Sequence, residues 1–245
     1  MRPSPIFLVI VGVFIASCVW ATQIDGIGPA RWAVRAVVFS GWVLSLCLHE
    51  FGHAATAFVG GDHTVADKGY LTLDPRKYAH VGLSLGLPIV FLLLGGIGLP
   101  GGAVWINHGL IRSAKLRSLM SFAGPFANIA SAVLLAIPLQ MGVFDSMPAL
   151  MMGLSFLALL QVSTALLNLL PVPGLDGFGV LSPFLPDSVI RSAAQVRGYG
   201  FLILFILLSR TGLGTLLWDT SDRIGEAIGI PLQLAEYGRA LFSFT

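Results

Sequence analysis

The sequence predicts an all-α polytopic membrane protein with about five to six membrane segments and one short, membrane-associated β element. Composition is the first reason: of 245 residues, 56% are hydrophobic and only 11% are charged, whereas roughly a quarter of the residues in soluble domains are charged. The second reason is that apolar residues gather in runs close to the ~20 residues that cross a bilayer. We therefore expect a single integral membrane domain over residues 1–245, surrounded by the lipid bilayer.

The charge composition argues against one class of partner. The chain has 14 Lys and Arg against 12 Asp and Glu, a formal net charge of +2. No basic run is interleaved with aromatic residues, as would be typical of a nucleic-acid-binding surface. We expect no nucleic-acid partner.

Residues 1–22 are expected to form the first membrane helix. Arg2 precedes the apolar run PIFLVIVGVFIASCVWA, and a short apolar run behind a positive charge also fits an export signal. Residues 15–18, IASC, resemble the cleavage box of a lipoprotein. An uncleaved helix is the preferred interpretation, because a polytopic protein needs no removable signal.

The second apolar stretch, Trp32–Gly60, carries the motif HEFGH near its C-terminal end. Residues four apart in a helix share one face, so His49 and His53 can bind one Zn²⁺ while Glu50 lies beside them. Zinc lowers the pKa of a bound water to about 7, and a carboxylate nearby can then act as the general base. Ionisable side chains in a membrane helix are costly and usually functional. The pattern predicts a hydrolytic zinc site, and a satisfied polar cluster is the alternative.

Two short stretches after this helix alternate in polarity as strands do, namely Gly69–Pro75 and Ala103–Asn107. They form the predicted β element. Between them, Val81–Leu94 is apolar but short, which leaves open a re-entrant segment or a complete crossing. His63 and His80 are expected to be solvated loop residues.

Further membrane helices are predicted at about Leu119–Met141, Ala149–Leu170 and Gly198–Trp218. The core of the domain therefore covers residues 32–218. The tail, residues 219–245, is mildly amphipathic and is expected on the membrane surface.

Zinc needs a third protein ligand, because catalytic sites usually have three and one open position. Asp176 follows an apolar helix within the breaking sequence of residues 171–177, PVPGLDG, which allows its carboxylate to turn inward. The same residues favour an ordinary helix-terminal turn, so both interpretations stay open. Cys47 points about 200° away from His49 around the helix. We expect it and Cys18 to be small core residues.

Three motifs together resemble the site-2 protease family of intramembrane zinc metalloproteases: HEFGH at 49–53, GPFAN at 124–128 and NLLPVPGLDG at 168–177. The resemblance covers about residues 32–218. The sequences YLTLDP at 70–75 and AVWIN at 103–107 are similar to small prokaryotic members that lack a PDZ domain. The chain departs from those members at Asp74, where Asn is frequent, and at residues 102–104, which replace a more proline-rich strand.

The resemblance implies one zinc ion per chain, bound by His49, His53 and Asp176, with Glu50 as the general base. It also implies that Asn128 and Asn168 bind the substrate backbone or the oxyanion of the reaction. Packing between helices is the alternative for both, because buried amides in lipid need partners. The implied activity is that of a zinc metalloendopeptidase, which cuts within or next to the transmembrane segments of other membrane proteins in regulated intramembrane proteolysis.

Sharing one zinc ion requires residues 61–117 to begin and end on the same side of the membrane. With the N-terminus inside, most basic residues fall on the cytoplasmic side, namely Arg2, Lys68, Arg76, Lys77, Arg112, Lys115, Arg117, Arg191 and Arg197. Only Arg31, Arg35 and Arg210 fall outside. By the positive-inside rule, we expect a multi-pass protein of the prokaryotic plasma membrane with its active site toward the cytoplasmic face.

A non-enzymatic membrane protein is the competing class, either a divalent-metal permease or an inactive protease-like scaffold. Intramembrane His and Asp residues also mark ion pathways. A carrier needs ligands but no general base, and an inactive relative would be expected to lack one of the four site residues. The presence of Glu50 therefore favours the protease.

Overall fold

Helices make up all the regular structure in the described part of the chain. The computed structural model describes residues 2–24, 26–78, 104–196, 199, 204, 206, 208 and 210–243, and no strand occurs among them. The α-helices are α1 (Pro5–Ala21), α2 (Ile27–Gly60), α3 (Thr64–Asp67), α5 (Ala114–Gln140), α6 (Pro148–Asn168), α7 (Asp176–Leu181), α8 (Asp187–Val196), α10 (Leu213–Ala227) and α11 (Leu232–Phe242). The 3-10 helices are η1 (Tyr70–Thr72), η2 (Pro75–Lys77), η4 (His108–Leu110) and η5 (Ser182–Phe184).

The ends of the long helices follow local sequence signals. The hydroxyl of Ser4 accepts a hydrogen bond from Phe7 N at the start of α1, 3.1 Å away. Ser113 caps α5 in the same way through Leu116 N, at 3.2 Å. Each hydroxyl satisfies a backbone N–H that the first turn leaves without a partner. α2 ends where Gly61 adopts a φ of +123°, a conformation that favours glycine.

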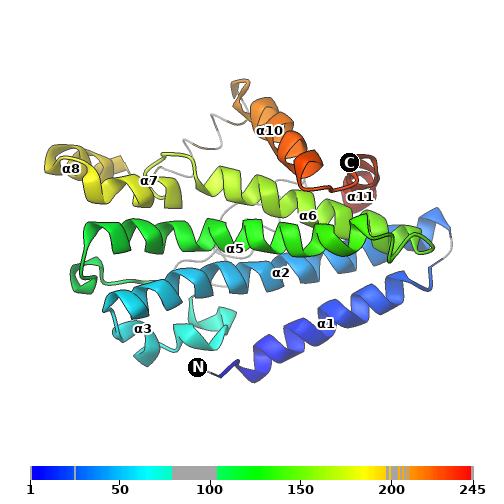
Figure 1. The fold of residues 1–245 in the computed structure, drawn as a ribbon, viewed down its shortest axis with the longest axis horizontal. Coiled ribbons are helices and arrows are strands. Elements are labelled where there is room, and N and C mark those ends of the chain that lie inside the picture. The colour runs from blue at the N-terminus through cyan, green and yellow to red at the C-terminus, as the bar shows by residue number, and fades with distance from the viewer. Residues whose placement is uncertain are drawn as a thin grey trace.

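α2 is the central helix of the bundle and packs against α1, α5, α6 and α11 (Figure 1). One core cluster joins α2 to α6 and α11 through Val34, Val38, Trp42, Leu46, Phe156, Leu157, Leu160 and Phe242. Neighbouring helices therefore separate much of α2 from its surroundings. This is why a membrane helix can carry ionisable residues in its interior.

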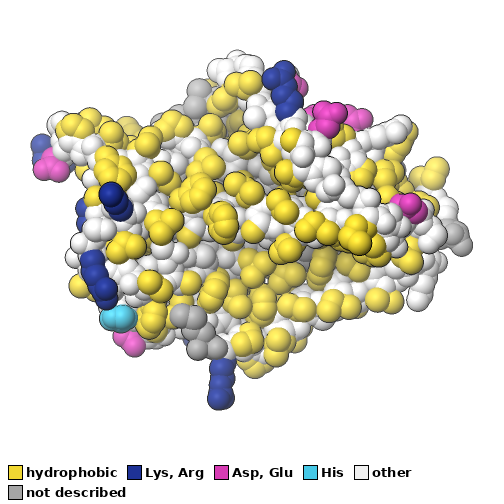
Figure 2. All heavy atoms as spheres, viewed as in Figure 1, with side chains coloured by type: hydrophobic (Ala, Val, Ile, Leu, Met, Phe, Trp, Pro, Cys, Tyr) yellow, Lys and Arg dark blue, Asp and Glu magenta, His cyan; other side chains and the backbone are white. Residues whose placement is uncertain are grey.

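The described part of the chain confirms the prediction of a helical protein with helices that are long and apolar enough to cross a membrane. Within the described residues, α2, α5 and α6 are long and apolar enough to cross a bilayer, and α1 is a shorter apolar helix. Apolar side chains cover much of the face seen in Figure 2, while Lys and Arg side chains lie mainly at its margins. The count of about five to six segments stays a prediction. Val81–Leu94 lies outside the described residues, as do residues 198, 200–203, 205, 207 and 209 of Gly198–Trp218, whose last part begins α10.

The predicted strand at Gly69–Pro75 is wrong. The segment forms η1 and the start of η2, with Gly69 at a φ of +75° and Leu73 at +59°. Left-handed residues of this kind turn the chain and cannot continue a strand. Tyr70 and Leu71 are both buried against α2, so the alternation does not separate two faces. Val104–Asn107 also forms no strand. Ala103 lies outside the described residues.

The end of α2 and the start of α5 lie at the same end of the bundle, whereas the predicted return of residues 61–117 to one side of the membrane stays a prediction. Arg112 N donates to the carbonyl of Gly60 at 3.1 Å, which joins the end of α2 to the start of α5. Ser4 N donates to Thr72 O at 2.8 Å, which brings the N-terminal segment to the same region. In Figure 1, α3, the start of α5 and α7 lie at this end, whereas α11 lies toward the other.

The C-terminal tail is part of the helical bundle. α11 packs against α6 and α2, and Phe242 is fully buried beside Phe156. Arg35 of α2 donates to the carbonyls of Phe242 and Ser243 at 3.0 and 2.9 Å. The buried arginine thus ties the last helix to α2. Contact of the exposed side of the tail with a membrane surface stays a prediction.

Candidate metal centre

Two glycines allow α2 and α5 to approach closely at the HEFGH motif. A Cβ on Gly52 of α2 would lie 2.7 Å from the carbonyl oxygen of Ala123 in α5. A Cβ on Gly124 of α5 would lie 2.6 Å from His49 Nε2 and would also collide with His53 Nε2. Small residues let membrane helices pack backbone against backbone. Here they place the α5 backbone directly against the two imidazoles.

Asp176 reaches the same place from the end of α6. The chain leaves α6 at Asn168, turns through Gly174 at a φ of +107°, and starts α7 at Asp176. A Cβ on Gly177 would collide with the carbonyl of Leu169, so α7 folds back closely over the end of α6. The predicted helix break is confirmed, and it places Asp176 in the first turn of a new short helix.

Three donor atoms converge between α2 and α7. His49 Nε2 and His53 Nε2 lie 3.1 Å apart. The Asp176 carboxylate lies 3.2 Å from His49 Nε2 and 3.3 Å from His53 Nε2, through different oxygens. The carboxylate therefore faces both imidazoles.

The other nitrogen of each imidazole is held by a carbonyl oxygen from α5. His53 Nδ1 lies 2.7 Å from the Met120 carbonyl, and His49 Nδ1 lies 2.5 Å from Asn128 Oδ1. Because a carbonyl oxygen only accepts, each Nδ1 carries the proton. Each Nε2 then directs its lone pair toward the shared centre, as metal-binding histidines require.

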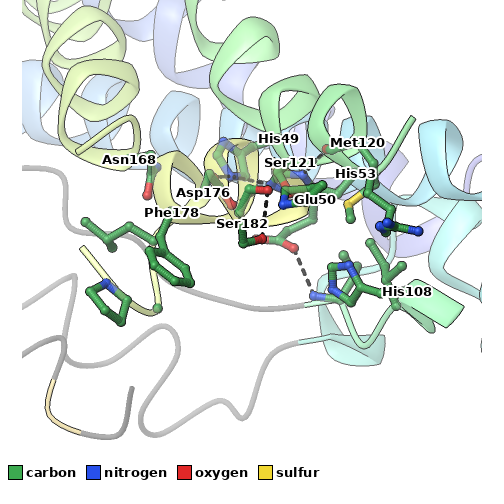
Figure 3. A pocket seen from close by; sticks show the side chains of 18 of the residues that line it. His49, Glu50, His53, His108, Met120, Ser121, Asn168, Asp176, Phe178 and Ser182 are labelled. Carbon is green, nitrogen blue, oxygen red and sulfur yellow. Dashed lines mark hydrogen bonds and ion pairs between the residues drawn. The ribbon is translucent and has the colours of Figure 1, made fainter. Parts of the chain in front are cut away.

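Glu50 lies at the edge of this centre and is only 4% exposed. Its Oε2 accepts a hydrogen bond from Val104 N at 3.1 Å. Figure 3 shows Glu50 beside His49, His53 and Asp176, with the bond to the loop residue drawn as a dashed line. The carboxylate is thus held from the side of the 104–107 segment, next to the two histidines.

These groups line a cavity of about 580 Å³ (Figure 3). Its wall comes from α2, α5, α6, α7 and α8. Asp187 and Ile190 of α8 line the cavity and are exposed at the surface. The cavity therefore connects the buried histidines with the end of the bundle.

Comparison with known proteins decides the family. No family model and no solved structure matches the chain. Over its full length, however, it is 43% identical to Rip2 of Mycolicibacterium smegmatis and 42% identical to Rip2 of Mycobacterium tuberculosis, and covers 95% of each. It is 30% identical to YwhC of Bacillus subtilis over 185 residues, 72% of this chain and 81% of that relative. All three are named as zinc metalloproteases. The chain belongs to the site-2 protease family.

The donor geometry of this site-2 protease fits the zinc ion that its family implies. Ligand bonds of about 2.0–2.2 Å in a tetrahedral site place ligand atoms about 3.3 Å apart. The two Nε2 atoms lie 3.1 Å apart, and each lies 3.2 or 3.3 Å from a different oxygen of Asp176, so the three side chains surround a space close to that of one ion. The Cβ that Gly124 lacks would fall close to both Nε2 atoms. The glycine therefore keeps open the space that the ion needs.

All six residues that the sequence singled out line the same cavity, namely His49, Glu50, His53, Asp176, Asn128 and Asn168. The Asn128 amide joins two other side chains of the centre. Its Oδ1 lies beside His49 Nδ1, and its Nδ2 donates to Gln161 Oε1. Sequence reasoning did not single out Gln161 or Gly124. The GPFAN motif contained a signal for the glycine, whereas Gln161 stands out only as an amide inside an apolar helix.

The prediction for Cys47 is confirmed. It is a buried free thiol, as expected for a core residue. Cys18 is half-buried and also a free thiol. His63 lies in the loop between α2 and α3, where its side chain is exposed and its ring contacts Phe58. His80 lies outside the described residues.

Proposed function

We propose that this site-2 protease is an endopeptidase of the cell membrane in which His49, His53 and Asp176 bind zinc and Glu50 is the general base. Two observations support this proposal. Ligand atoms of the three side chains lie within 4.8 Å of one another inside an apolar bundle, and a buried glutamate lies beside them. Zinc bound there supplies a Lewis acid that polarises a carbonyl and acidifies a water molecule.

Glu50 moves the proton in this scheme. Its Oε2 is held by Val104 N–H, which orients the carboxylate while the second oxygen takes the proton of the attacking water. The same carboxylate then delivers that proton to the leaving amine. A carboxylate this deeply buried and adjacent to the ligands has a role in hydrolysis, whereas a metal carrier has no use for it.

The proposed substrates are membrane proteins with a transmembrane segment. A substrate helix hides its peptide bonds within its own hydrogen bonds, so it must unwind locally before cleavage. The 104–107 segment, which lines the cavity through Val104 and Ile106, is the proposed contact for the unwound chain through its backbone. Residues 70–74 are not proposed as a second contact of this kind, because Tyr70–Thr72 form a 3-10 helix that is followed by left-handed Leu73.

We propose that the cavity faces the cytoplasm and that cleavage serves regulated intramembrane proteolysis. The basic residues of the end that carries the cavity support this orientation, since Lys68, Arg112, Lys115 and Arg117 follow α2 or begin α5 there. Cysteines introduced at Lys115 and, at the other end, Asp145 provide the test. Labelling by an impermeant thiol reagent in intact cells should occur at position 145 only, and the reverse pattern would overturn the orientation.

The decisive experiment compares the wild type with Glu50→Gln in detergent. We expect one zinc per chain in both and cleavage of transmembrane peptides only by the wild type. Absence of zinc from both would overturn the site. Cleavage by both would remove Glu50 as the base, and zinc without cleavage in either would favour the scaffold alternative.

A further inference from the structure

Gln161 lies in the middle of α6 and is 1% exposed. Its Oε1 accepts a hydrogen bond from Asn128 Nδ2 at 2.7 Å, and Asn128 Oδ1 in turn lies 2.5 Å from His49 Nδ1. One continuous chain of side-chain hydrogen bonds therefore runs from α6 through α5 to the metal-facing imidazole of α2. Gln161 has no proposed role as a zinc ligand or as a general base. It is connected to His49 through Asn128.

The donor and the acceptor of each of these hydrogen bonds follow from the state of His49. A ligand nitrogen at Nε2 requires the proton on Nδ1, so Asn128 must present its oxygen to His49. The amide nitrogen of Asn128 then points away from His49 and needs an acceptor. Gln161 Oε1 is that acceptor, which leaves only one compatible orientation of the Asn128 amide.

The two histidines differ in how firmly their partners are fixed. His53 bonds to the carbonyl of Met120, a backbone group that cannot turn over. The Asn128 amide can rotate, and the reversed amide would offer a donor to His49 Nδ1. That arrangement favours the tautomer with a proton on Nε2, which cannot bind metal.

We propose that Gln161 is a positioning residue for zinc: by accepting from Asn128, it holds the asparagine in the one orientation that leaves His49 Nε2 free for the ion. This inference rests on the zinc site proposed above. Packing does not account for a glutamine here. Its Nε2 is buried with no hydrogen-bond partner in the described part of the chain, and a methionine of similar volume would avoid the cost of burying that donor.

The test measures zinc affinity by chelator competition on full-length protein in detergent. Gln161→Met, which removes the acceptor and keeps the volume, should weaken zinc binding about 10–100-fold, the usual effect of losing a partner behind a ligand. Gln161→Glu keeps an acceptor oxygen and should stay within about threefold of the wild type. Ser163→Ala is the matched control in the same helix, because Ser163 is equally buried and its hydroxyl donates to the Leu160 carbonyl of its own helix.

A double-mutant comparison separates positioning from packing. In an Asn128→Asp background either side-chain oxygen can accept from His49, so no orientation has to be selected. Adding Gln161→Met there should change zinc affinity much less than it does in the wild type. Equal losses in both backgrounds would show a packing role and overturn the proposal, as would wild-type affinity in Gln161→Met alone.

The absorption bands of the cobalt-substituted protein give a second readout. They should change in Gln161→Met and stay unchanged in Ser163→Ala, and identical bands in all three proteins would overturn the proposal. Failure of the parent site is distinguishable, because the wild type itself would then bind neither metal. Poor folding of Gln161→Met would appear as a lowered thermal midpoint of the metal-free protein, and Gln161→Leu, which also removes the acceptor, then takes its place in both backgrounds with the same expected and contradicting outcomes.

Discussion

Gly124 of α5 lies directly over His49 of α2, so close that a Cβ at this glycine would sit 2.6 Å from Nε2. The missing side chain is a requirement of the centre, because the same methyl group would also meet His53 Nε2. The two imidazoles lie between the α5 backbone on one side and Asp176 on the other. The ligands are thus placed by helix packing as much as by the HEFGH sequence.

Gly124→Ala should therefore abolish zinc binding, with a loss of affinity of at least about 100-fold, because the methyl group occupies the space of the ion. Metal content after gel filtration measures this directly. Gly12→Ala in α1 is the control, since a Cβ there has nothing within 4 Å. Normal zinc content in Gly124→Ala would mean that α5 can move away from α2.

Asp176→Asn should lower zinc affinity by about 100-fold or more while preserving the fold. The amide is a poorer zinc ligand than a carboxylate and removes the negative charge opposite the two histidines. Chelator competition gives the affinity. Asp187→Asn, at an exposed position on the wall of the same cavity, should leave it unchanged. Equal affinities of Asp176→Asn and the wild type would remove Asp176 from the ligand set.

Arg35→Leu should release the C-terminal helix without affecting zinc. The buried guanidinium donates to the Phe242 and Ser243 carbonyls, and hydrogen bonds from charged groups contribute about 1.5–3 kcal/mol. We expect a lower thermal midpoint and faster proteolysis near the C-terminus, with normal metal content. Arg31→Leu, an exposed residue one turn earlier in α2, should do neither. An unchanged midpoint for Arg35→Leu would show that apolar packing alone holds α11.

We expect acid to loosen the 104–107 segment, which contacts Glu50, because Asp62 anchors this segment. Fully buried, Asp62 accepts hydrogen bonds from Thr64 N, Thr64 Oγ1 and Asn107 N. Burial alone would raise its pKa, but the Thr64 hydroxyl and the Asn107 and Thr64 amides outweigh burial and lower the pKa below its ordinary value. A group with a depressed folded pKa stabilises the fold above its unfolded pKa, and that stability is lost as the pH falls through the folded value.

Hydrogen exchange at Asn107 and its neighbours should therefore accelerate as the pH is lowered from about 4, after correction for intrinsic exchange. Asp62→Asn should exchange faster already at neutral pH and lack the acid-dependent change. The same acid response in both proteins would assign the effect to another group. Because Val104 in this segment donates to Glu50, loss of the anchor is also expected to loosen the carboxylate.

Short sequence patterns were sufficient to predict much of the site. The spacing of His49 and His53 was sufficient to predict that both face one ion, because a helix sets that relation over four residues. Long apolar runs predicted α5 and α6 to within a few residues. The alternation at residues 69–75 misled, because left-handed backbone at Gly69 and Leu73 turns the chain, and polarity patterns do not report that conformation.

The sequence by itself determined that this is a helical membrane protein with two histidines and a glutamate on one turn of a buried helix, since composition and helical period are local properties. Only the tertiary structure decided how close Asp176 lies to the two imidazoles, that Gly124 leaves room for an ion, and that Gln161 reaches His49 through Asn128. These relations join residues distant in the chain and depend on how closely three helices pack. No local pattern encodes such a distance, because the contact of backbones and side chains across helices sets it.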